Sequence, residues 1–454
     1  MAIETRNPST GKVVKRFEPH SDAHIDTAIA TSLAAFKVLR LWTFEQRAHS
    51  MLKAADILDN EVGALARIMT LEMGKTFIAA KAEVAKCAKV CRYYAQTAQE
   101  HLADDIVQTQ AKKSYRKYLP LGPVLAVMPW NYPLWQVFRF AAPALMAGNT
   151  GLLKHASNVP QCALAIEDIL QRAGFPDGAF QTLLIGGAKV ERVLRDFRVT
   201  AATLTGSEPA GASVARICGE EIKPTLLELG GSDGFIIMPS ADIDQAVKFG
   251  TIARTQNNGQ SCIAAKRFFI HADVYGEVRD KLKQSFKALV VGDPMSESTD
   301  IGPLVSQAAV EEVSEQVSNA IEKGAHRVCG AEVIDSDGYY FKPGILENIP
   351  KDARIYQEEI FAPVALLFKV RSLTEAIEKT NNSPFGLGSS LWTQNPEEME
   401  LGIRDIEAGA TFINSMTSSH QALPFGGVKR SGYGRELASE GIRTFCNVKT
   451  VNIA

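Results

Sequence analysis

Short apolar segments that alternate with helical ones are the feature that most constrains the fold of this chain. Five segments of buried-strand length occupy residues 124–128, 150–154, 180–185, 201–204 and 225–228. Amphipathic helical patterns separate them, most clearly at residues 160–172 and 210–218. Strands that lack polar alternation and are joined through helices are typical of a parallel sheet covered on both faces. The sequence therefore predicts an α/β fold with a doubly wound parallel sheet.

A second alternating series begins near Gly234. It predicts strands at residues 235–238, 267–271, 364–370 and 410–413, and helices at residues 242–255, 274–289, 310–323 and 373–380. This series indicates a second α/β domain. Upstream of both series, residues 44–94 have apolar residues at helical spacing, which predicts two or three amphipathic helices that cover a sheet.

Two polar ribbons fit neither domain. Residues 111–118 alternate with the period of a strand, and residues 445–451 resemble them. Because neither has an obvious partner within its own domain, we expect both to form a small sheet that bridges subunits.

Length and charge exclude several classes of function. A chain of 454 residues exceeds what one core usually serves. Its 49 basic and 51 acidic residues give a net charge of −2, which provides no field for nucleic acid or an anionic membrane. No apolar run approaches the roughly 20 residues of a membrane helix, so we expect a cytoplasmic protein.

The seven cysteines are an odd number and have no CxxC spacing, which disfavours a disulfide framework or a zinc site. Cys87 and Cys91 lie one helical turn apart and could be metal ligands, but no histidine or further cysteine lies nearby in sequence. We therefore expect no metal site and treat most cysteines as small buried apolar residues.

Cys262 is the exception among the cysteines. The helix that starts near Ser240 or Asp242 should end at Asn257-Asn258-Gly259, which places Cys262 in a loop before the next strand. Its neighbours Gln260 and Ser261 are too polar for a core strand. A cysteine on such a loop, with carboxylates available as bases, indicates a thiol nucleophile rather than a structural cysteine.

Two phosphate-binding motifs are absent. Gly74-Lys75-Thr76 has the ending of a phosphate loop, but Met69 stands where its first glycine should be and the surrounding pattern is helical. No GxGxxG sequence follows the first strand. Dinucleotide binding therefore cannot be inferred from either motif.

Six short motifs occur in a fixed order and together resemble the NAD(P)-dependent aldehyde dehydrogenase superfamily over nearly the whole chain. They are Met128-Pro129-Trp130-Asn131-Tyr132-Pro133, Leu204-Thr205-Gly206-Ser207, Glu228-Leu229-Gly230-Gly231, Gly259-Gln260-Ser261-Cys262, Glu359-Ile360-Phe361 and Pro424-Phe425-Gly426-Gly427. The resemblance implies a Rossmann-like cofactor domain at residues 1–107 and 126–228. It also implies a catalytic domain at residues 229–423 and a bridging, oligomerisation segment at residues 108–125 and 424–454. We expect a homodimer or a dimer of dimers.

The resemblance also implies the catalytic residues. Cys262 attacks the aldehyde carbon to give a thiohemiacetal, and the Asn131 amide stabilises the oxyanion. Hydride transfer to nicotinamide leaves a thioester. Glu228 then activates the water that hydrolyses it, a role that suits a carboxylate buried at the end of an apolar strand.

The cofactor residues follow from the same resemblance. Lys154 should contact the adenosine ribose, and Ser157 stands where NAD-preferring members commonly carry a glutamate. Serine accommodates the 2′-phosphate that a carboxylate would repel, so we expect NADP, with NAD as a weaker alternative. The other expected cofactor contacts are Trp130, Asn131, Gly206, Ser207, Leu229, Glu359 and Phe361.

A substrate with a carboxylate is the expected partner. If a helix covers residues 132–140, then Asn131, Trp135 and Arg139 share one face. Arg139, with Ser419 of the loop at residues 415–419, resembles the carboxylate site of the succinate-semialdehyde dehydrogenases, although Gln256 replaces a second arginine that some of them have. We expect NADP-preferring oxidation of succinate semialdehyde to succinate. The alternatives are a broad short-chain aldehyde dehydrogenase, a CoA-acylating enzyme or a catalytically silent homologue.

Overall fold

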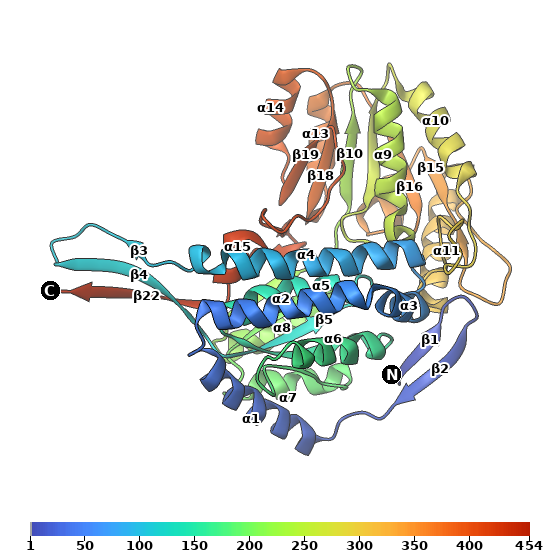
Figure 1. The fold of residues 1–454 in the computed structure, drawn as a ribbon. Helices are drawn as coiled ribbons and strands as arrows, with labels where there is room; N and C mark the ends of the chain where they lie inside the picture. The colour runs from blue at the N-terminus through green and yellow to red at the C-terminus, as the bar shows by residue number, and fades with distance from the viewer. Residues whose placement is uncertain (1) are drawn as a thin grey trace.

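The first lobe is built on the parallel sheet that the sequence predicts. The computed structural model describes residues 2–454, and this lobe is the lower one in Figure 1. Its six strands lie in the order β21-β9-β8-β5-β6-β7. In chain order they are β5 (Pro123–Met128), β6 (Thr150–His155), β7 (Phe180–Thr182), β8 (Ala201–Thr205), β9 (Thr225–Glu228) and the short β21 (Gly432–Tyr433), which is antiparallel to β9.

The topology of this sheet is doubly wound, as predicted. From β5 the chain proceeds outwards through β6 and β7, then returns to the other side of β5 for β8 and β9. The direction of winding therefore reverses between β5 and β8. In open α/β sheets this reversal opens a crevice at the carboxyl ends of the strands, where ligands bind.

Helices cover both faces of the first sheet. One apolar cluster joins helices α2 to α6 to one face, and a second joins α1, α7 and α8 to the other. The predicted helical region at residues 44–94 is confirmed as three helices. The helices of this lobe are α1 (Asp22–Leu39), α2 (Phe44–Asn60), α3 (Val62–Met73), α4 (Phe77–His101), α5 (Trp135–Ala147), α6 (Pro160–Arg172), α7 (Val190–Arg195) and α8 (Glu208–Glu220).

The second lobe is a seven-stranded sheet in the order β12-β15-β16-β11-β10-β18-β19, with only β12 antiparallel. Four of its strands were predicted, and β12, β15 and β18 were not. The strands are β10 (Asp233–Ile237), β11 (Ala265–His271), β12 (His326–Cys329), β15 (Gly344–Glu347), β16 (Val364–Val370), β18 (Gly388–Trp392) and β19 (Ala410–Ile413). The helices are α9 (Ile243–Thr255), α10 (Tyr275–Ala288), α11 (Gln307–Glu322), α12 (Arg354–Gln357), α13 (Leu373–Asn381) and α14 (Pro396–Asp405).

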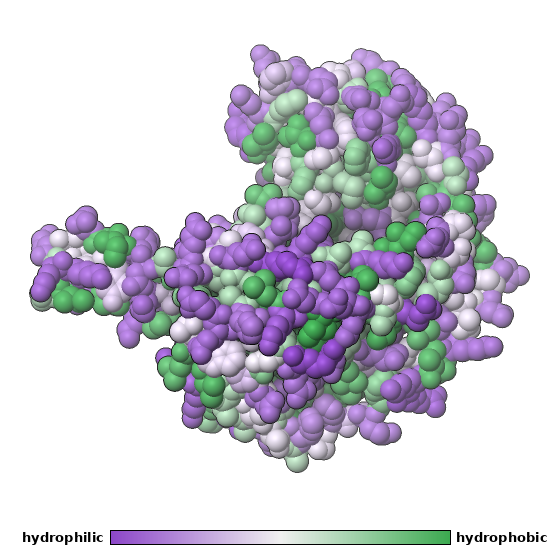
Figure 2. Space-filling model, in the orientation of Figure 1, coloured by the Kyte–Doolittle hydropathy of each residue, from purple (hydrophilic) through white to green (hydrophobic). Residues whose placement is uncertain are grey.

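A three-stranded arm projects from the first lobe (Figure 1). The two polar ribbons, which we expected to form a small sheet, pair with each other in the same chain: β4 (Lys113–Pro120) runs antiparallel to β22 (Cys446–Ile453), and β3 (Asp105–Ile106) adds the third strand. Figure 2 shows apolar side chains on this arm, and Ile106 and Val448 are more than half exposed. That the arm bridges subunits stays a prediction.

Short elements complete the chain. They are β1 (Ile3–Asn7), β2 (Lys12–Phe17), β13 (Glu332–Val333), β14 (Phe341–Lys342), β17 (Phe385–Gly386), β20 (Val428–Lys429), α15 (Ala438–Arg443) and the 3-10 turns Gly187–Lys189 and Gln256–Gly259. Residues 424–443, which we assigned to the bridging segment, also contribute β21 to the first sheet. The domain boundaries stay a prediction.

Two predictions about helices were wrong. The segment Gly74-Lys75-Thr76 is not helical but connects α3 to α4: Gly74 ends α3 with a positive φ of 82°, and Thr76 caps α4. Helix α5 begins at Trp135 rather than at Tyr132, so Asn131 lies before the helix and shares no helical face with Arg139.

The buried carboxylate of Glu83 explains where α5 starts. Helix α5 has no side-chain cap of its own, and Glu83 on α4 accepts the backbone N–H groups of Leu134 and Trp135, each at 2.9 Å. Its other carboxylate oxygen pairs with the Lys75 ammonium, which is also buried. A helix N-terminus favours a negative charge, so Glu83 stabilises the first turn of α5 from outside the helix.

The model also bears on membranes and metals. In the described part of the chain no helix is both long and apolar enough to span a membrane. Within residues 2–454 no three potential metal-ligating side chains come together.

Replacing Glu83 with alanine should lower the free energy of unfolding by about 3 to 5 kcal/mol, because the Lys75 ammonium would stay buried without a counter-ion. Denaturant unfolding followed by tryptophan fluorescence measures the loss. The matched control is Arg216→Ala, which removes an exposed ion pair with Glu220 and should change the stability far less. Equal losses in the two variants would show that Glu83 does not hold α4 and α5 together.

Candidate active site

The two lobes meet around a cavity of about 230 Å³. The carboxyl ends of β5, β8 and β9 supply one wall, and the segments that precede β11 and β16 supply the other. The structure brings together here Cys262 and seven of the nine residues that were predicted to bind the cofactor: Trp130, Asn131, Gly206, Ser207, Leu229, Glu359 and Phe361. Lys154 and Ser157 do not line this cavity and lie at the carboxyl end of β6, the next strand along the same edge.

A smaller cavity of about 70 Å³ lies on the other side of Cys262. Trp135, Arg139 and Ser419, the three residues predicted to bind the substrate, all line it. Cys262 and Gln136 line both cavities. The thiol therefore stands where the two cavities meet.

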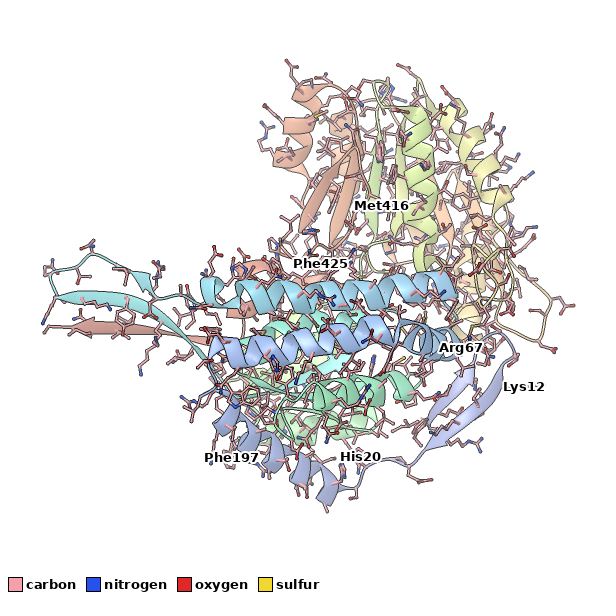
Figure 3. The ribbon with its side chains drawn as sticks, in the orientation of Figure 1. Lys12, His20, Arg67, Phe197, Met416 and Phe425 are labelled. Atoms are coloured by element: carbon pink, nitrogen blue, oxygen red, sulfur yellow. The ribbon has the colours of Figure 1, made fainter. Side chains whose placement is uncertain are left out.

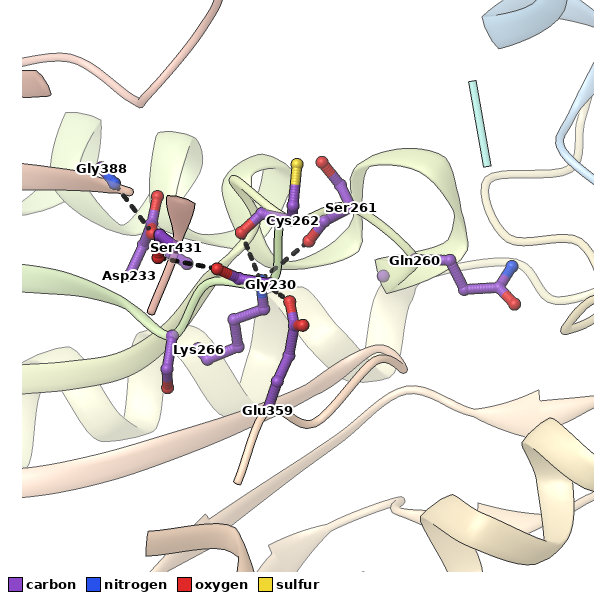
Figure 4. Close-up of polar contacts among 12 residues, drawn as sticks. Gly230, Asp233, Gln260, Ser261, Cys262, Lys266, Glu359, Gly388 and Ser431 are labelled. Carbon is purple, nitrogen blue, oxygen red and sulfur yellow. Dashed lines mark hydrogen bonds and ion pairs between the residues drawn. The ribbon is translucent and has the colours of Figure 1, made fainter. Parts of the chain in front are cut away.

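The loop that carries Cys262 is held by its backbone carbonyls. Lys266, fully buried at the start of β11, donates to the carbonyls of Ser261 at 2.8 Å and Cys262 at 2.6 Å, and it pairs with Glu359 at 2.9 Å (Figure 4). In the same figure the sulfur of Cys262 points away from Lys266. The lysine thus fixes the loop and links it to Glu359 while the thiol stays free.

The polar neighbours of Cys262 are buried, which the sequence did not predict. Gln260 and Ser261 have no exposed surface, and the Gln260 side chain accepts the Val305 N–H at 2.9 Å. Arg254 of α9, also fully buried, donates to the Gly259 carbonyl at 2.6 Å. The polar side chains in and around this segment therefore form hydrogen bonds with buried backbone groups that lie outside helices and strands, and they do not face solvent.

Glycines next to Glu228 allow the lobes to approach. A side chain on Gly231 would start 2.7 Å from the Cys262 carbonyl oxygen, and one on Gly230 would start 2.6 Å from a Glu359 carboxylate oxygen. The Cys262 backbone leaves no room for a Cβ atom on Gly231, whereas one on Gly230 would require the Glu359 carboxylate to move. The two glycines connect β9 of the first lobe directly to β10 of the second.

Asn131 lies beside the loop that carries Cys262. It is buried, and its side-chain amide donates to the Gln260 carbonyl at 3.2 Å. Asn257 donates to the Asn131 carbonyl at 2.8 Å and to the same Gln260 carbonyl at 2.9 Å. These bonds place a side-chain N–H donor beside the loop of Cys262, within the larger cavity.

Burial raises the pKa of the Cys262 thiol to about 12, although Lys266 and Arg139 oppose the shift. Raising the pKa of an acid favours its protonated form. At neutral pH the resting residue is therefore a thiol rather than a thiolate.

Glu228 is a second buried ionisable group close to Cys262. It ends β9 and is almost completely buried, and burial together with the Glu436 carboxylate raises its pKa well above the ordinary value. Its Oε1 atom lies against Gly426, where a Cβ atom would approach it to 2.8 Å. Glu228 lines neither cavity, but its charge is close enough to contribute to the raised pKa of Cys262.

Arg139 is already paired. On α5 its guanidinium forms an ion pair with buried Glu436, lies 3.5 Å from the Thr205 hydroxyl and stacks over the Phe425 ring at 4.6 Å. Figure 3 shows Phe425 at the level where the second lobe meets α4. Arg139 therefore lines the smaller cavity while its charge is already paired with Glu436.

Comparisons with known proteins agree with this geometry. The family model described as "Aldehyde dehydrogenase family" matches residues 1–451. The chain belongs to the aldehyde dehydrogenase family. Among curated relatives, the succinate-semialdehyde dehydrogenase [NADP(+)] of Mycobacterium avium is 56% identical over 99% of this chain and 96% of its own length. The corresponding enzyme of Mycobacterium tuberculosis is 55% identical over the full length of both chains.

Solved structures in the family superpose on the whole chain. The succinic semialdehyde dehydrogenase from Streptococcus pyogenes, solved in complex with NADP+, is 39% identical, has a TM-score of 0.97 and is covered completely. The α/β architecture and the family assignment made from the sequence are confirmed.

Sequence reasoning missed several members of this aldehyde dehydrogenase site. Lys86 and Gln136 line the smaller cavity, Glu436 pairs with Arg139, and Lys266 holds the nucleophile loop. The signal for Lys86 was weak. It lies three residues after Glu83 on α4, so two charged residues fall beside the apolar stripe of one helix.

The raised thiol pKa predicts how Cys262 reacts with an alkylating agent. Below pH 12 the thiolate fraction increases about tenfold per pH unit, so alkylation of Cys262 by iodoacetamide should accelerate about tenfold per unit between pH 7 and 10. Mass spectrometry of the Cys262 peptide measures the rate without any need for turnover. The partly exposed Cys329 in the same digest serves as the internal reference. A plateau below about pH 9 would show that the thiol is acidic in the resting protein.

Proposed function

We propose that this aldehyde dehydrogenase oxidises succinate semialdehyde to succinate and prefers NADP+ as the oxidant. One observation carries the proposal: Cys262 separates a large cavity at the carboxyl edge of the first sheet from a small cavity with a basic lining. The first suits a dinucleotide and the second a short acidic aldehyde. The names of the mycobacterial and streptococcal relatives support the same substrate and cofactor.

The residues present fit a dinucleotide. Helix α8 begins directly after Gly206 and Ser207 of the larger cavity, and the Ser207 side chain caps none of its N–H groups. Free N–H groups at a helix N-terminus bind phosphate without a net positive charge on the protein. Trp130 and Phe361, edge to face at 5.8 Å, line the same cavity. When NADP+ is bound there, its nicotinamide accepts the hydride.

Ser157 and Lys154 support the preference for NADP+. Ser157 follows β6 and is partly exposed, and its carbonyl accepts the Glu4 N–H at 3.1 Å, so β1 fixes the backbone at this point. Burial lowers the pKa of the Lys154 ammonium. A hydroxyl and an ammonium at the end of this strand can bind a phosphate monoester that a carboxylate would repel.

The first chemical step belongs to Cys262 and Asn131. After losing its proton, the sulfur attacks the aldehyde carbon, and the carbonyl oxygen becomes an alkoxide. The Asn131 amide lies beside the nucleophile loop and can turn from the Gln260 carbonyl to that alkoxide. One such donor typically contributes about 3 kcal/mol to the transition state.

The second step belongs to Glu228. Once the hydride has left, a thioester joins the acyl group to Cys262, and water must attack it. Burial raises the pKa of Glu228, which makes its carboxylate a stronger base for that water than an exposed glutamate. We assign it the role of general base for hydrolysis.

The proposed activity predicts a specific pattern with a small panel of substrates. With purified protein, kcat/KM should be highest for succinate semialdehyde with NADP+, lower with NAD+, and at least about tenfold lower for butanal, which lacks the carboxylate. Steady-state absorbance of the reduced cofactor measures all combinations. Equal rates for succinate semialdehyde and butanal would favour a broad short-chain aldehyde dehydrogenase. A requirement for CoA would favour an acylating enzyme.

A substitution at Ser157 tests the preference for NADP+ over NAD+. Ser157→Glu should weaken NADP+ by about 1 to 3 kcal/mol through like-charge repulsion and spare NAD+. Fluorescence titration of each cofactor measures the difference, with Asn158→Glu at the next position as the control for added charge. Equal losses for both cofactors would mean that Ser157 does not face the ribose.

Glu228→Ala should separate the two chemical steps. Hydride transfer precedes hydrolysis, so the variant should release a burst of about one NADPH per site and then turn over at least about a hundredfold more slowly. Stopped-flow absorbance measures the burst, with the exposed Glu297→Ala as the control. If the burst is also lost, Glu228 is the group that removes the proton from Cys262.

A further inference from the structure

The charges around the smaller cavity do not balance. Five ionisable groups face it or lie directly behind it: Arg139, its partner Glu436, Lys86, and the Cys262 thiol and Tyr132 hydroxyl, whose raised pKa values keep both neutral. The Arg139 guanidinium is matched by the Glu436 carboxylate. Within residues 2–454 no carboxylate forms an ion pair with Lys86, so the cavity carries one uncompensated positive charge.

Lys86 is nevertheless partly buried. It projects from α4 towards the cavity, its ammonium donates to the Ser419 hydroxyl at 2.6 Å, and it lies 4.2 Å from the centre of the Trp135 ring. An ammonium has three N–H donors, and Ser419 accepts one of them. Neither a hydroxyl nor an aromatic ring neutralises a buried charge as an anion does.

The surroundings make this charge costly in the absence of a ligand. Burial and the nearby Arg139 guanidinium together lower the pKa of Lys86 to about 8, although Glu83 and Cys87 on its own helix oppose the shift. An anion bound at the ammonium would remove most of this penalty. The arrangement is therefore suited to an anionic ligand.

We propose that Lys86 is the residue that binds the free carboxylate of the substrate, with Ser419 and Trp135 positioning its ammonium. Arg139 then keeps Glu436 in place instead of binding the substrate directly. This inference rests on the proposed function, because it assigns the acid-binding end of the same site. It also names the ligand class: a short aliphatic chain that ends in one carboxylate.

The first test compares two aldehydes. Lys86→Met removes the charge but retains the length and apolar contacts of the side chain, and Lys86→Arg retains the charge. For Lys86→Met, the ratio of kcat/KM for succinate semialdehyde to that for butanal should fall by about 10-fold to 100-fold, mainly through KM. Lys86→Arg should recover most of this ratio. The control is Lys89→Met, an exposed lysine on the same helix, which should leave the ratio unchanged.

The second test needs no turnover. Butyrate should slow the alkylation of Cys262 by iodoacetamide, whereas uncharged butyramide at the same concentration should not. This protection should be lost in Lys86→Met and retained in Lys86→Arg. Because the readout is carboxylate binding alone, it still reports on Lys86 if the wild-type protein turns out not to prefer succinate semialdehyde.

Two outcomes would overturn the proposal. If Lys86→Met leaves the substrate ratio within about twofold of wild type and butyrate still protects, the carboxylate binds elsewhere, and Arg139 becomes its partner. If Lys86→Met slows both aldehydes equally and Lys86→Arg recovers neither, Lys86 supports the fold of α4 and does not contact the substrate.

Discussion

The site depends on one buried carboxylate that lines neither cavity. Glu83 on α4 accepts the first free N–H groups of α5 and pairs with Lys75, so two helices and a connecting segment share a single acidic group. Helix α5 carries Trp135 and Arg139, and α4 carries Lys86 one turn beyond Glu83. The walls of the smaller cavity are therefore held in register by an interaction that no substrate touches.

Buried cations have a similar part elsewhere in the site. Lys266 and Arg254 donate to backbone carbonyls of the nucleophile loop, where an irregular chain would otherwise leave acceptors unsatisfied. Both are fully buried, and burial lowers the pKa of Arg254 to about 9. These two charges are removed from water, and their hydrogen bonds hold the loop that carries Cys262 at the junction of the two cavities.

The sequence was most informative where structure follows local pattern. The five parallel strands of the first sheet and helix α6 were all predicted, because periodicity and flanking residues determine them. The start of α5 was wrong because its cap comes from α4, 52 residues away in the chain. Lys86 and Glu436 were missed for the same reason, since the importance of each depends on a partner that only the folded chain brings near.

The pairing of β4 with β22 must wait until the last part of the chain has been synthesised. Ser114 bonds with Asn452, which is made 338 residues later, and Glu436, the partner of Arg139, is made almost as late. At a synthesis rate of about 5 to 20 residues per second, one edge of β4 stays unpaired for roughly 17 to 68 seconds. Cys262 is translated during that interval, before Glu436 is available to form its ion pair with Arg139. The outer pairing of β4 and the ion pair behind the smaller cavity are therefore among the last contacts that the growing chain can complete.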